Sequence, residues 1–434
     1  MKKAIIIQRM RVEKEEGFFK TRVVFDLKVP KQVGLSSNTL IFEYDIDDVK
    51  ANGDAAIFSL LPVAFWTNVD IVIGDAISRS PFLQKNVGKI CAVWNKLFDY
   101  KREVNIAGGR LFESGRTPSL KSGLLFSGGV DSLASYIDKS SEIEYLLFCF
   151  GADIFDFNKF NEVKKRIDDL NMVLNKKTLF YSTNIRRITD VPWGQILHAC
   201  ALLGPALVFS ARIQKIIISS TDFQDIAENH AWGSSPLTDK YISSSNISVE
   251  HYGTHLSRLE KIKKISHYPA YLGICRVCYQ ESKQYNCGFC EKCLRTMVTL
   301  ILLRIPANQV PFPSDAYSLD HILSCMSRLK KCKPGALAYW VEILEDVKNK
   351  KFDLSDQERL LIEQKLSDFL GDFYYEYQER HNNLKFYKKF LNRTKTRRLE
   401  AFFHLPADSL QFLNLWERFL RAKYYYLKNK IRRA

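Results

Sequence analysis

A short apolar run that ends in two adjacent glycines constrains this chain more than any other feature. The run at 124–126 is typical of a buried strand, and Ser-Gly-Gly-Val-Asp-Ser follows it at 127–132. Two adjacent glycines allow the backbone to turn tightly and to bring its N–H groups close to a ligand. The helix predicted to follow, at 132–138, adds unpaired N–H donors and the positive end of its dipole. The stretch therefore predicts an anion-binding turn suited to phosphate.

The side chains of this turn suit the same kind of ligand. The hydroxyl groups of Ser127 and Ser132 add hydrogen-bond donors. Asp131 is suited to hold a magnesium ion that bridges phosphate oxygens, which makes it the candidate catalytic residue. The alternative is an ordinary strand–turn–helix connection, because serine, glycine and aspartate are common turn residues.

Strands and helices alternate through residues 121–303, around this turn. Such alternation predicts an α/β fold with a doubly wound parallel sheet, in which ligands bind at the carboxyl ends of the strands. Gly151 follows the second strand, where it would line the adenine side of such a crevice. The strands are predicted at 123–126, 145–150, 178–182 and 215–219, and the helices at 132–138, 158–175 and 195–214.

The flanking regions differ in pattern from this central domain. Residues 1–120 are predicted to form a separate α+β module, either a structural cap or a partner-binding or dimerising module. Prolines between 306 and 313 open a C-terminal, mostly helical region at 304–434. Its last part, 381–434, holds fourteen lysines and arginines against three acids. Nucleic-acid binding through phosphates and stacking is one interpretation, but a helical hairpin with its cations in solvent is favoured.

Five of the ten cysteines lie between residues 275 and 293. Cys278, Cys287, Cys290 and Cys293 have the spacing of a tetrahedral structural zinc site, and Cys275 is an alternate ligand. A disulfide or an incidental cluster is the alternative. This density of thiols suggests metal binding in a reducing compartment, so we expect a cytoplasmic protein.

No membrane association is expected from the sequence. The apolar run near the N-terminus is too short for the core of a signal peptide. The longest uncharged run, 191–211, is interrupted by Pro192, Gly194, Gly204 and Pro205. A buried helix is therefore predicted there rather than a membrane span.

Two of these motifs together resemble a known enzyme family. The sequence SGGVDS is similar to the signature of the PP-loop ATP pyrophosphatases, which split ATP between its α and β phosphates and adenylate a substrate. The cysteine spacing C-x8-C-x2-C-x2-C resembles the zinc loop of the 7-cyano-7-deazaguanine synthases, which carry the same turn at the same end of the catalytic domain. The resemblance covers residues 121–303 and neither flanking region.

This resemblance implies a set of cofactors and a reaction. ATP, magnesium and zinc are the expected cofactors. In that family, ATP adenylates 7-carboxy-7-deazaguanine, ammonia attacks to give an amide, and a second round gives the nitrile. By resemblance, the four cysteines of the x8-x2-x2 spacing hold the zinc. The implied ATP-binding residues are Ser127, Gly128, Gly129, Val130, Asp131 and Ser132, with Gly151.

The sequence departs from the family where the acceptor substrate would bind. Usual synthases carry Val-Pro-Gly-Arg-Asn before the long helix, whereas this chain has Val-Pro-Trp-Gly-Gln at 191–195. The stretches at 219–223 and 232–239 also differ from their family counterparts. These departures put the nitrile step, and ammonia as the nucleophile, in question. The candidate substrate-binding residues are Gln195, Asp222, Trp232 and Ser235.

Extended and divergent chains of this kind resemble the synthase-like proteins of bacterial antiviral operons (the Qat and type IV CBASS kinds). For those, transfer of the activated deazaguanine to an amine of a partner protein is expected. The sequence therefore predicts adenylation of 7-carboxy-7-deazaguanine or a close analogue, an amide- or nitrile-type product, and a protein partner from the same operon.

Three alternatives stay open at this stage. The first is an ordinary 7-cyano-7-deazaguanine synthase for queuosine biosynthesis. The second is a PP-loop tRNA thiolase with an iron–sulfur cluster, which would be brown where a zinc protein is colourless. The third is a non-catalytic subunit that binds a nucleotide only to regulate a complex.

Overall fold

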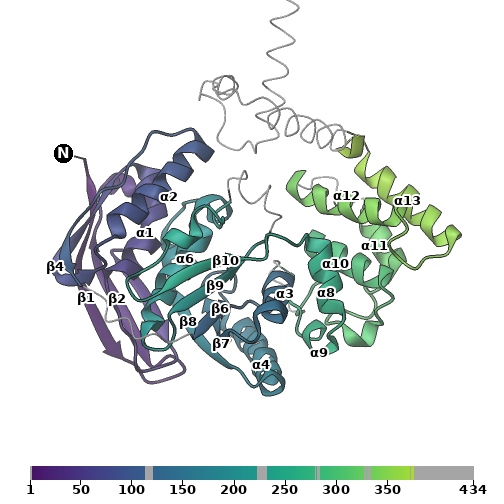
Figure 1. Cartoon of the computed structure of the whole chain (residues 1–434), viewed down its shortest axis with the longest axis horizontal. Coiled ribbons are helices and arrows are strands. Elements are labelled where there is room, and N and C mark those ends of the chain that lie inside the picture. The colour runs from purple at the N-terminus through teal and green to yellow at the C-terminus, as the bar shows by residue number, and fades with distance from the viewer. Residues whose placement is uncertain are drawn as a thin grey trace, which may run out of the picture. The chain divides into compact units, whose positions relative to one another are not determined.

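A ten-stranded, mostly parallel sheet is the framework of the chain in the computed structural model (Figure 1). Its strand order is β10-β9-β6-β7-β8-β3-β2-β1-β4-β5. The first five strands in this order pair in parallel, whereas β8, β3, β2 and β1 pair with one another in antiparallel fashion. The strands are β1 (Ala4–Lys14), β2 (Thr21–Lys28), β3 (Thr39–Tyr44), β4 (Asp70–Arg79), β5 (Ile106–Leu111), β6 (Ser122–Leu125), β7 (Ile143–Phe150), β8 (Lys177–Thr183), β9 (Lys215–Ser219) and β10 (Ser248–Tyr252).

The chain divides into two compact units. The first comprises Met1–Cys287 and Asn308–Pro311 and contains the sheet, and the second comprises Gly288–Ala307 and Phe312–Ala434. The predicted basic helices beyond residue 375 lie outside the described part of the chain. The structure describes residues 2–112, 121–221, 232–278, 280, 284–326, 329, 334–371 and 373–375.

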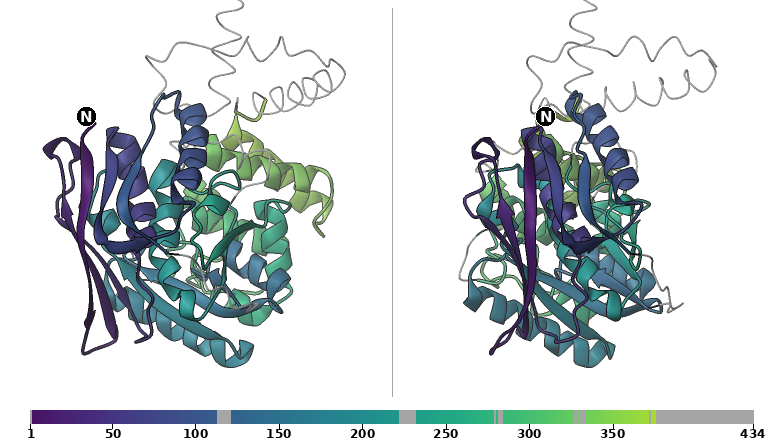
Figure 2. Two further views of the ribbon diagram at one scale, coloured as in Figure 1. Left: turned by 60° about the vertical axis from the view of Figure 1, so that its left-hand side comes forward. Right: turned by 90° about the vertical axis from the view of Figure 1, so that its left-hand side faces the viewer.

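The N-terminal strands continue the central sheet and do not form a module with a sheet of its own (Figure 2). β3 pairs with β8, and Tyr44 lies opposite Tyr181 in this register. Both tyrosines are buried in the same core, which extends from the N-terminal strands to β9. The predicted boundary near residue 120 therefore falls inside one sheet, and the second division lies at residue 287 and not at 303.

The strand order of the parallel half reverses at β6. This strand comes first in sequence in that half, yet it lies between β7 on one side and β9 on the other. Counted from β6 as the first strand, the order is 3-2-1-4-5, as in Rossmann-like α/β folds. In such sheets, the crevice outside the carboxyl ends of the strands opens where the order reverses.

Helices cover both faces of the parallel half, because its strands are apolar on both sides. On β7, Leu147 belongs to the core that the sheet shares with α1, α2 and α6. The next residue, Phe148, faces the other way and contacts Phe160 of α4. The helices of the first unit are α1 (Gly53–Thr67), α2 (Leu83–Phe98), α3 (Val130–Lys139), α4 (Phe157–Leu174), α5 (Ile185–Ile188), α6 (His198–Ala206), α8 (Arg258–Ser266) and α9 (Pro269–Leu272).

The long helix predicted at 195–214 is divided into three parts. A π-helical turn at Trp193–Leu197 leads into α6, and a 3-10 helix at Leu207–Ala211 follows. Pro205 has no N–H to donate within α6, which interrupts the α-helical hydrogen-bond pattern near its end. The stretch Trp193–Ala211 is the one helical segment of the described residues long and apolar enough to span a membrane, and 67% of it is buried inside the protein. The prediction of a buried helix is therefore confirmed.

The second unit is helical in its described part. Trp340 of α12 is fully buried, packs against Phe369 of α13, and donates from Nε1 to Glu291 Oε1 of α10 over 3.2 Å. Arg304 and Glu358 form a two-pronged ion pair on its surface. Its helices are α10 (Glu291–Leu302), α11 (Leu319–Met326), α12 (Pro334–Lys348) and α13 (Asp356–Leu370).

The close contact between α1 and α6 depends on a glycine and predicts a stability effect. A Cβ atom at Gly204 would lie 2.3 Å from Ser59 Oγ and 2.9 Å from the carbonyl oxygen of Ala55. Gly204→Ala should therefore lower the free energy of unfolding by about 1–3 kcal/mol, measured by chemical denaturation. The matched control is Gly88→Ala in α2, where a Cβ meets nothing within 4 Å. That change should stabilise the protein by up to about 1 kcal/mol, and equal effects of the two changes would contradict this account.

Candidate functional site

The turn that follows β6 is the centre of the candidate site. Gly128 has a φ of +71°, a conformation that glycine adopts without strain, and Gly129 is the residue before the first turn of α3. The hydroxyl group of Ser132 donates to the Gly129 carbonyl over 3.0 Å, and the Gly129 N–H donates to Ser127 Oγ over 3.3 Å. Ser127 is exposed and Gly129 is half-buried, whereas Gly128 and Val130 are buried, so the turn meets solvent at Ser127 and Gly129.

The turn lies where the strand order reverses. β6 ends next to β7 on one side and β9 on the other, so the turn and the residues after β9 share the carboxyl edge of the sheet. The N-terminal end of α3 points its unpaired N–H groups toward the same place, because α3 starts directly after the glycines. The turn thus has the position and the local geometry that the predicted anion-binding feature requires.

Asp131 is engaged by two cations of α8. Its Oδ2 lies 2.5 Å from Arg258 Nη1, and its Oδ1 lies 3.3 Å from Lys261 Nζ. The side chains of Arg258 and Lys261 are 7% and 1% exposed. Burial disfavours the charged carboxylate, but the charges of Arg258 and Lys261 outweigh that effect and hold the pKa of Asp131 below its ordinary value.

This arrangement gives Asp131 a role besides the expected one. Each of its oxygens accepts one hydrogen bond from a cation of α8. Its predicted role as a magnesium ligand stays a prediction. In the structure, the carboxylate positions two buried cations beside the glycine turn, where a polyanion would meet them.

From the sequence, Arg258 and Lys261 were equally compatible with an approach to phosphate and with a solvated helix face, and they were not assigned to the site. They lie 127 and 130 residues from Asp131 in the chain, so no local pattern reports their approach. Two features of the sequence do indicate that these residues share one face of a helix. Ser257 and Glu260 form a capping box that starts α8, and residues at spacing i and i+3 lie on one face of a helix.

Gly151 has a steric role at the end of β7. Its φ is +84°, and a Cβ atom there would lie 2.3 Å from the carbonyl oxygen of Thr183 at the end of β8. Glycine thus allows the backbones at the ends of β7 and β8 to approach each other. Both ends lie on the carboxyl edge of the sheet, the edge that also holds the glycine turn.

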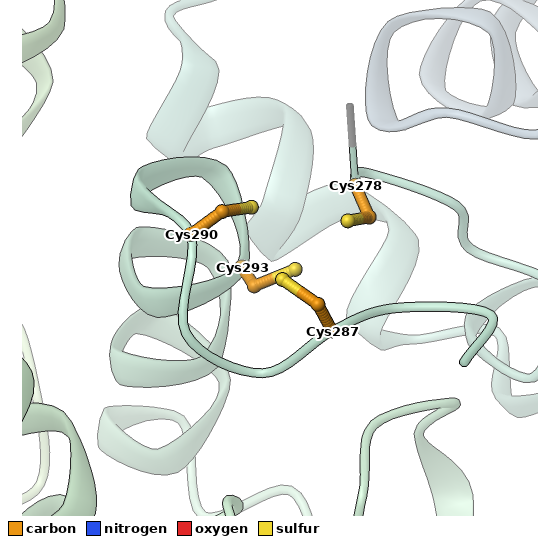
Figure 3. Close-up of side chains that lie close together, drawn as sticks. All are labelled: Cys278, Cys287, Cys290 and Cys293. Carbon is orange, nitrogen blue, oxygen red and sulfur yellow. The ribbon is translucent and has the colours of Figure 1, made fainter. Parts of the chain in front are cut away.

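The four cysteines of the predicted zinc loop come together (Figure 3). The Sγ atoms of Cys278, Cys287, Cys290 and Cys293 all lie within 4.8 Å of one another, and all four residues are buried. Cys290 precedes the first turn of α10 and Cys293 lies within it. Four thiols at this separation, shielded from water, fit a tetrahedral structural zinc ion.

Cys275 does not belong to this cluster. It is buried outside the group of four, and burial raises the pKa of its thiol to about 12. A thiol that stays protonated is a poor metal ligand, because the thiolate is the form that binds. The alternate ligand set with Cys275 is therefore not supported.

A single asparagine holds the two sides of the cysteine loop together. Asn286 Oδ1 accepts from the N–H groups of Val277 and Cys278 over 2.9 and 3.1 Å. Its Nδ2 donates to the carbonyl oxygens of Cys275 and Pro311, each over 2.9 Å. The two acceptor positions and the two donor positions of this buried amide are thus all used, which fixes the shape of the loop.

The cysteine loop also contacts the glycine turn. The N–H of Arg276 donates to the Gly128 carbonyl over 2.8 Å. Tyr285 donates from its hydroxyl group to the Ile274 carbonyl over 2.7 Å, and the Arg166 guanidinium lies 3.9 Å from its ring centre. A metal that fixes this loop would thereby also fix the backbone beside the turn.

Three of the four predicted substrate-binding residues lie near one another in the first unit. The Gly233 N–H donates to the Gly194 carbonyl over 2.7 Å, so the residue after Trp232 pairs with the residue before Gln195. The ring of Trp232 would lie 2.6 Å from a Cβ at Gly194. Ser235 lies three residues beyond Trp232 and donates from its N–H to Asp239 Oδ1 over 3.0 Å. Asp222 lies outside the described residues.

Comparisons of the chain with protein-family models, with curated proteins and with solved structures gave no match. The site is therefore defined by its own geometry.

The cysteine geometry predicts stoichiometric zinc. Purified protein should carry one zinc ion per chain and be colourless, because zinc has no visible absorbance. Cys290→Ser should lose the metal, as measured by elemental analysis, since three thiolates hold zinc less tightly than four. Cys275→Ser is the matched control and should keep its zinc. A brown protein, or equal zinc loss in both variants, would contradict this assignment.

Proposed function

We propose that this chain is an ATP-dependent enzyme that adenylates a carboxylate and passes the acyl group to an amine. The observation that carries the proposal is the glycine turn at the reversal of the strand order, with two buried cations beside it. The N–H groups at the start of α3, together with a guanidinium and an ammonium group, suit a triphosphate. The resemblance of SGGVDS to the PP-loop ATP pyrophosphatases supports the same ligand.

The proposed first half-reaction needs no nucleophile from the protein. A carboxylate oxygen of the substrate attacks the α-phosphorus of ATP, and the bond from that phosphorus to the bridging oxygen breaks. Pyrophosphate then leaves with the electron pair and with added negative charge. The backbone N–H groups of the turn, with Arg258 and Lys261, would stabilise that charge in place.

Asp131 contributes to this step by positioning. Its carboxylate holds Arg258 Nη1 and Lys261 Nζ in place, and Lys261 Nζ also donates to the Ser220 carbonyl over 2.6 Å. Because both cations are fixed before the nucleotide arrives, little ordering remains to be done when it binds. No step is assigned to a magnesium ion on Asp131.

The proposed substrate is 7-carboxy-7-deazaguanine or a close analogue, as the resemblance implies. The stretch around Gly194 and Trp232 supports a flat, aromatic ligand, because Trp193, His198 and Trp232 form a chain of ring contacts there. The Arg186 guanidinium lies 4.3 Å from the Trp193 ring centre and adds a cation–π contact. The product would be an amide, or a nitrile after a second round.

Zinc would be structural in this proposal. The four buried thiols fit the ion, and the loop that they close carries the Arg276 N–H that donates to Gly128. The ion would thus stabilise the backbone beside the nucleotide site without taking part in the reaction.

The cellular setting is proposed on the same basis. A protein partner that supplies the amine, a role in antiviral defence and a cytoplasmic location extend the resemblance of the sequence. The four buried cysteines that fit a metal ion support a reducing compartment. An ordinary 7-cyano-7-deazaguanine synthase differs from this proposal in using ammonia alone and in completing the nitrile.

The test is an ATP–pyrophosphate exchange assay. Exchange should depend on 7-carboxy-7-deazaguanine, because the reverse reaction requires its adenylate. Arg258→Gln should lower exchange by about 10- to 100-fold, since a hydrogen bond to a charged group contributes about 1.5–3 kcal/mol.

A control on the same helix separates this effect from a general change in charge. Lys264 pairs with Asp138 of α3, away from Asp131. Lys264→Gln should leave exchange within about twofold of wild type, because exposed ion pairs contribute little. Wild-type protein without substrate-dependent exchange would contradict the proposed function, as would equal losses in the two variants.

A further inference from the structure

A buried aspartate–histidine pair lies at the carboxyl edge of the sheet, outside the residues assigned so far. His251 on β10 places its Nδ1 2.8 Å from Asp239 Oδ2, and the two side chains are 3% and 0% exposed. Because β10 and β9 are parallel, the end of β10 that carries His251 lies at the same edge as the glycine turn.

The hydrogen bonds around Asp239 fix the tautomer of the histidine. Asp239 accepts from Ser234 Oγ over 2.7 Å, from the Ser235 N–H over 3.0 Å and from Thr238 Oγ1 over 3.1 Å. A carboxylate that accepts from all its neighbours requires a donor at Nδ1 of His251 as well. In the neutral ring, the lone pair is then on Nε2.

That Nε2 atom is buried and has no hydrogen-bond partner among the residues that the structure describes. A buried polar atom without a partner costs free energy, and a histidine that served only the fold would gain nothing by it. The pair therefore has the form of a positioned base, with one ring nitrogen held by a carboxylate and the lone pair of the other left unused.

Contacts connect this pair to both parts of the proposed site. On one side, the Tyr252 carbonyl accepts from the Ser220 N–H over 2.7 Å, and the Ser220 carbonyl accepts from Lys261 Nζ over 2.6 Å. On the other side, Ser234 follows Gly233, whose N–H donates to Gly194. Hydrogen bonds thus link the strand end that carries His251 to Ser220, which contacts Lys261, and link Asp239 to Ser234, next to the stretch that carries Trp232.

We propose that His251 is a catalytic base for the second half-reaction and that Asp239 is its positioning residue; this rests on the proposed function. The amine nitrogen attacks the carbonyl carbon of the acyl-adenylate and forms the C–N bond. Its proton passes to Nε2 of His251. The bond from the carbonyl carbon to the phosphate oxygen breaks, and AMP leaves with the electron pair. His251 then returns the proton to solvent.

The test separates the two half-reactions in the full-length protein. The substitution is His251→Asn, because an asparagine amide can keep the hydrogen bond to Asp239 while the Nε2 base is removed. ATP–pyrophosphate exchange with 7-carboxy-7-deazaguanine should stay within about twofold of wild type, which also shows that the variant folds. Amide formation with ammonium as the amine should fall by about 10²- to 10⁴-fold, the usual contribution of a general base.

Two further variants complete the test. Asp239→Asn should also slow amide formation more than exchange, because the ring would lose its fixed tautomer. His255→Asn changes a histidine that is 55% exposed, and both half-reactions should proceed as in wild type.

The remaining outcomes distinguish a failure of the role of His251 from a failure of the proposed function. Wild-type amide formation by the His251 variant, or an equal loss of both half-reactions, overturns the role of His251 and leaves the proposed function standing. Absence of exchange in the wild-type protein overturns the proposed function, and the role of His251 with it.

Discussion

The parallel pairing of β6 with a neighbour on each side is the constraint on which the rest of the site depends. β6 is four residues long, and it is hydrogen-bonded to β7 and to β9. A strand held in this way cannot shift its register without breaking two ladders, so its last residue is fixed. The position of the turn that follows is therefore fixed as well, and so is the start of α3. The pairing of the sheet thus determines where the candidate anion-binding turn lies.

The second organising interaction is the buried group of charges around Asp131. A buried carboxylate is costly unless it is paired, and here two cations from one helix compensate for it. The same pairing holds Arg258 and Lys261 in place beside the turn. Burial of these three charged groups costs free energy of folding, but it places two cations where a ligand with several negative charges would bind. The cysteine loop contacts the glycine turn as well, through the hydrogen bond from the Arg276 N–H to the Gly128 carbonyl.

Much of the local structure could be predicted from the sequence, because it depends on local patterns. The strand at 215–219 has the predicted bounds, and the four cysteines meet as their spacing indicates. What could not be predicted depends on contacts distant in sequence. The pairing of β3 with β8 joins the N-terminal region to the sheet, and the cations reach Asp131 from more than a hundred residues away. β10 was missed because its sequence, Ser-Val-Glu-His-Tyr, is too polar for a buried strand. Its place at the end of the sheet explains that composition.

The central claim is that a nucleotide triphosphate binds against the turn at 127–132. The most direct measurement is a crystal structure of the protein with α,β-methylene ATP, which cannot be split between its α and β phosphates. The account predicts phosphate oxygens within hydrogen-bond distance of the backbone N–H groups of Gly128 and Gly129 and of Arg258 and Lys261. A nucleotide bound elsewhere in the protein, with this turn unoccupied, would contradict it.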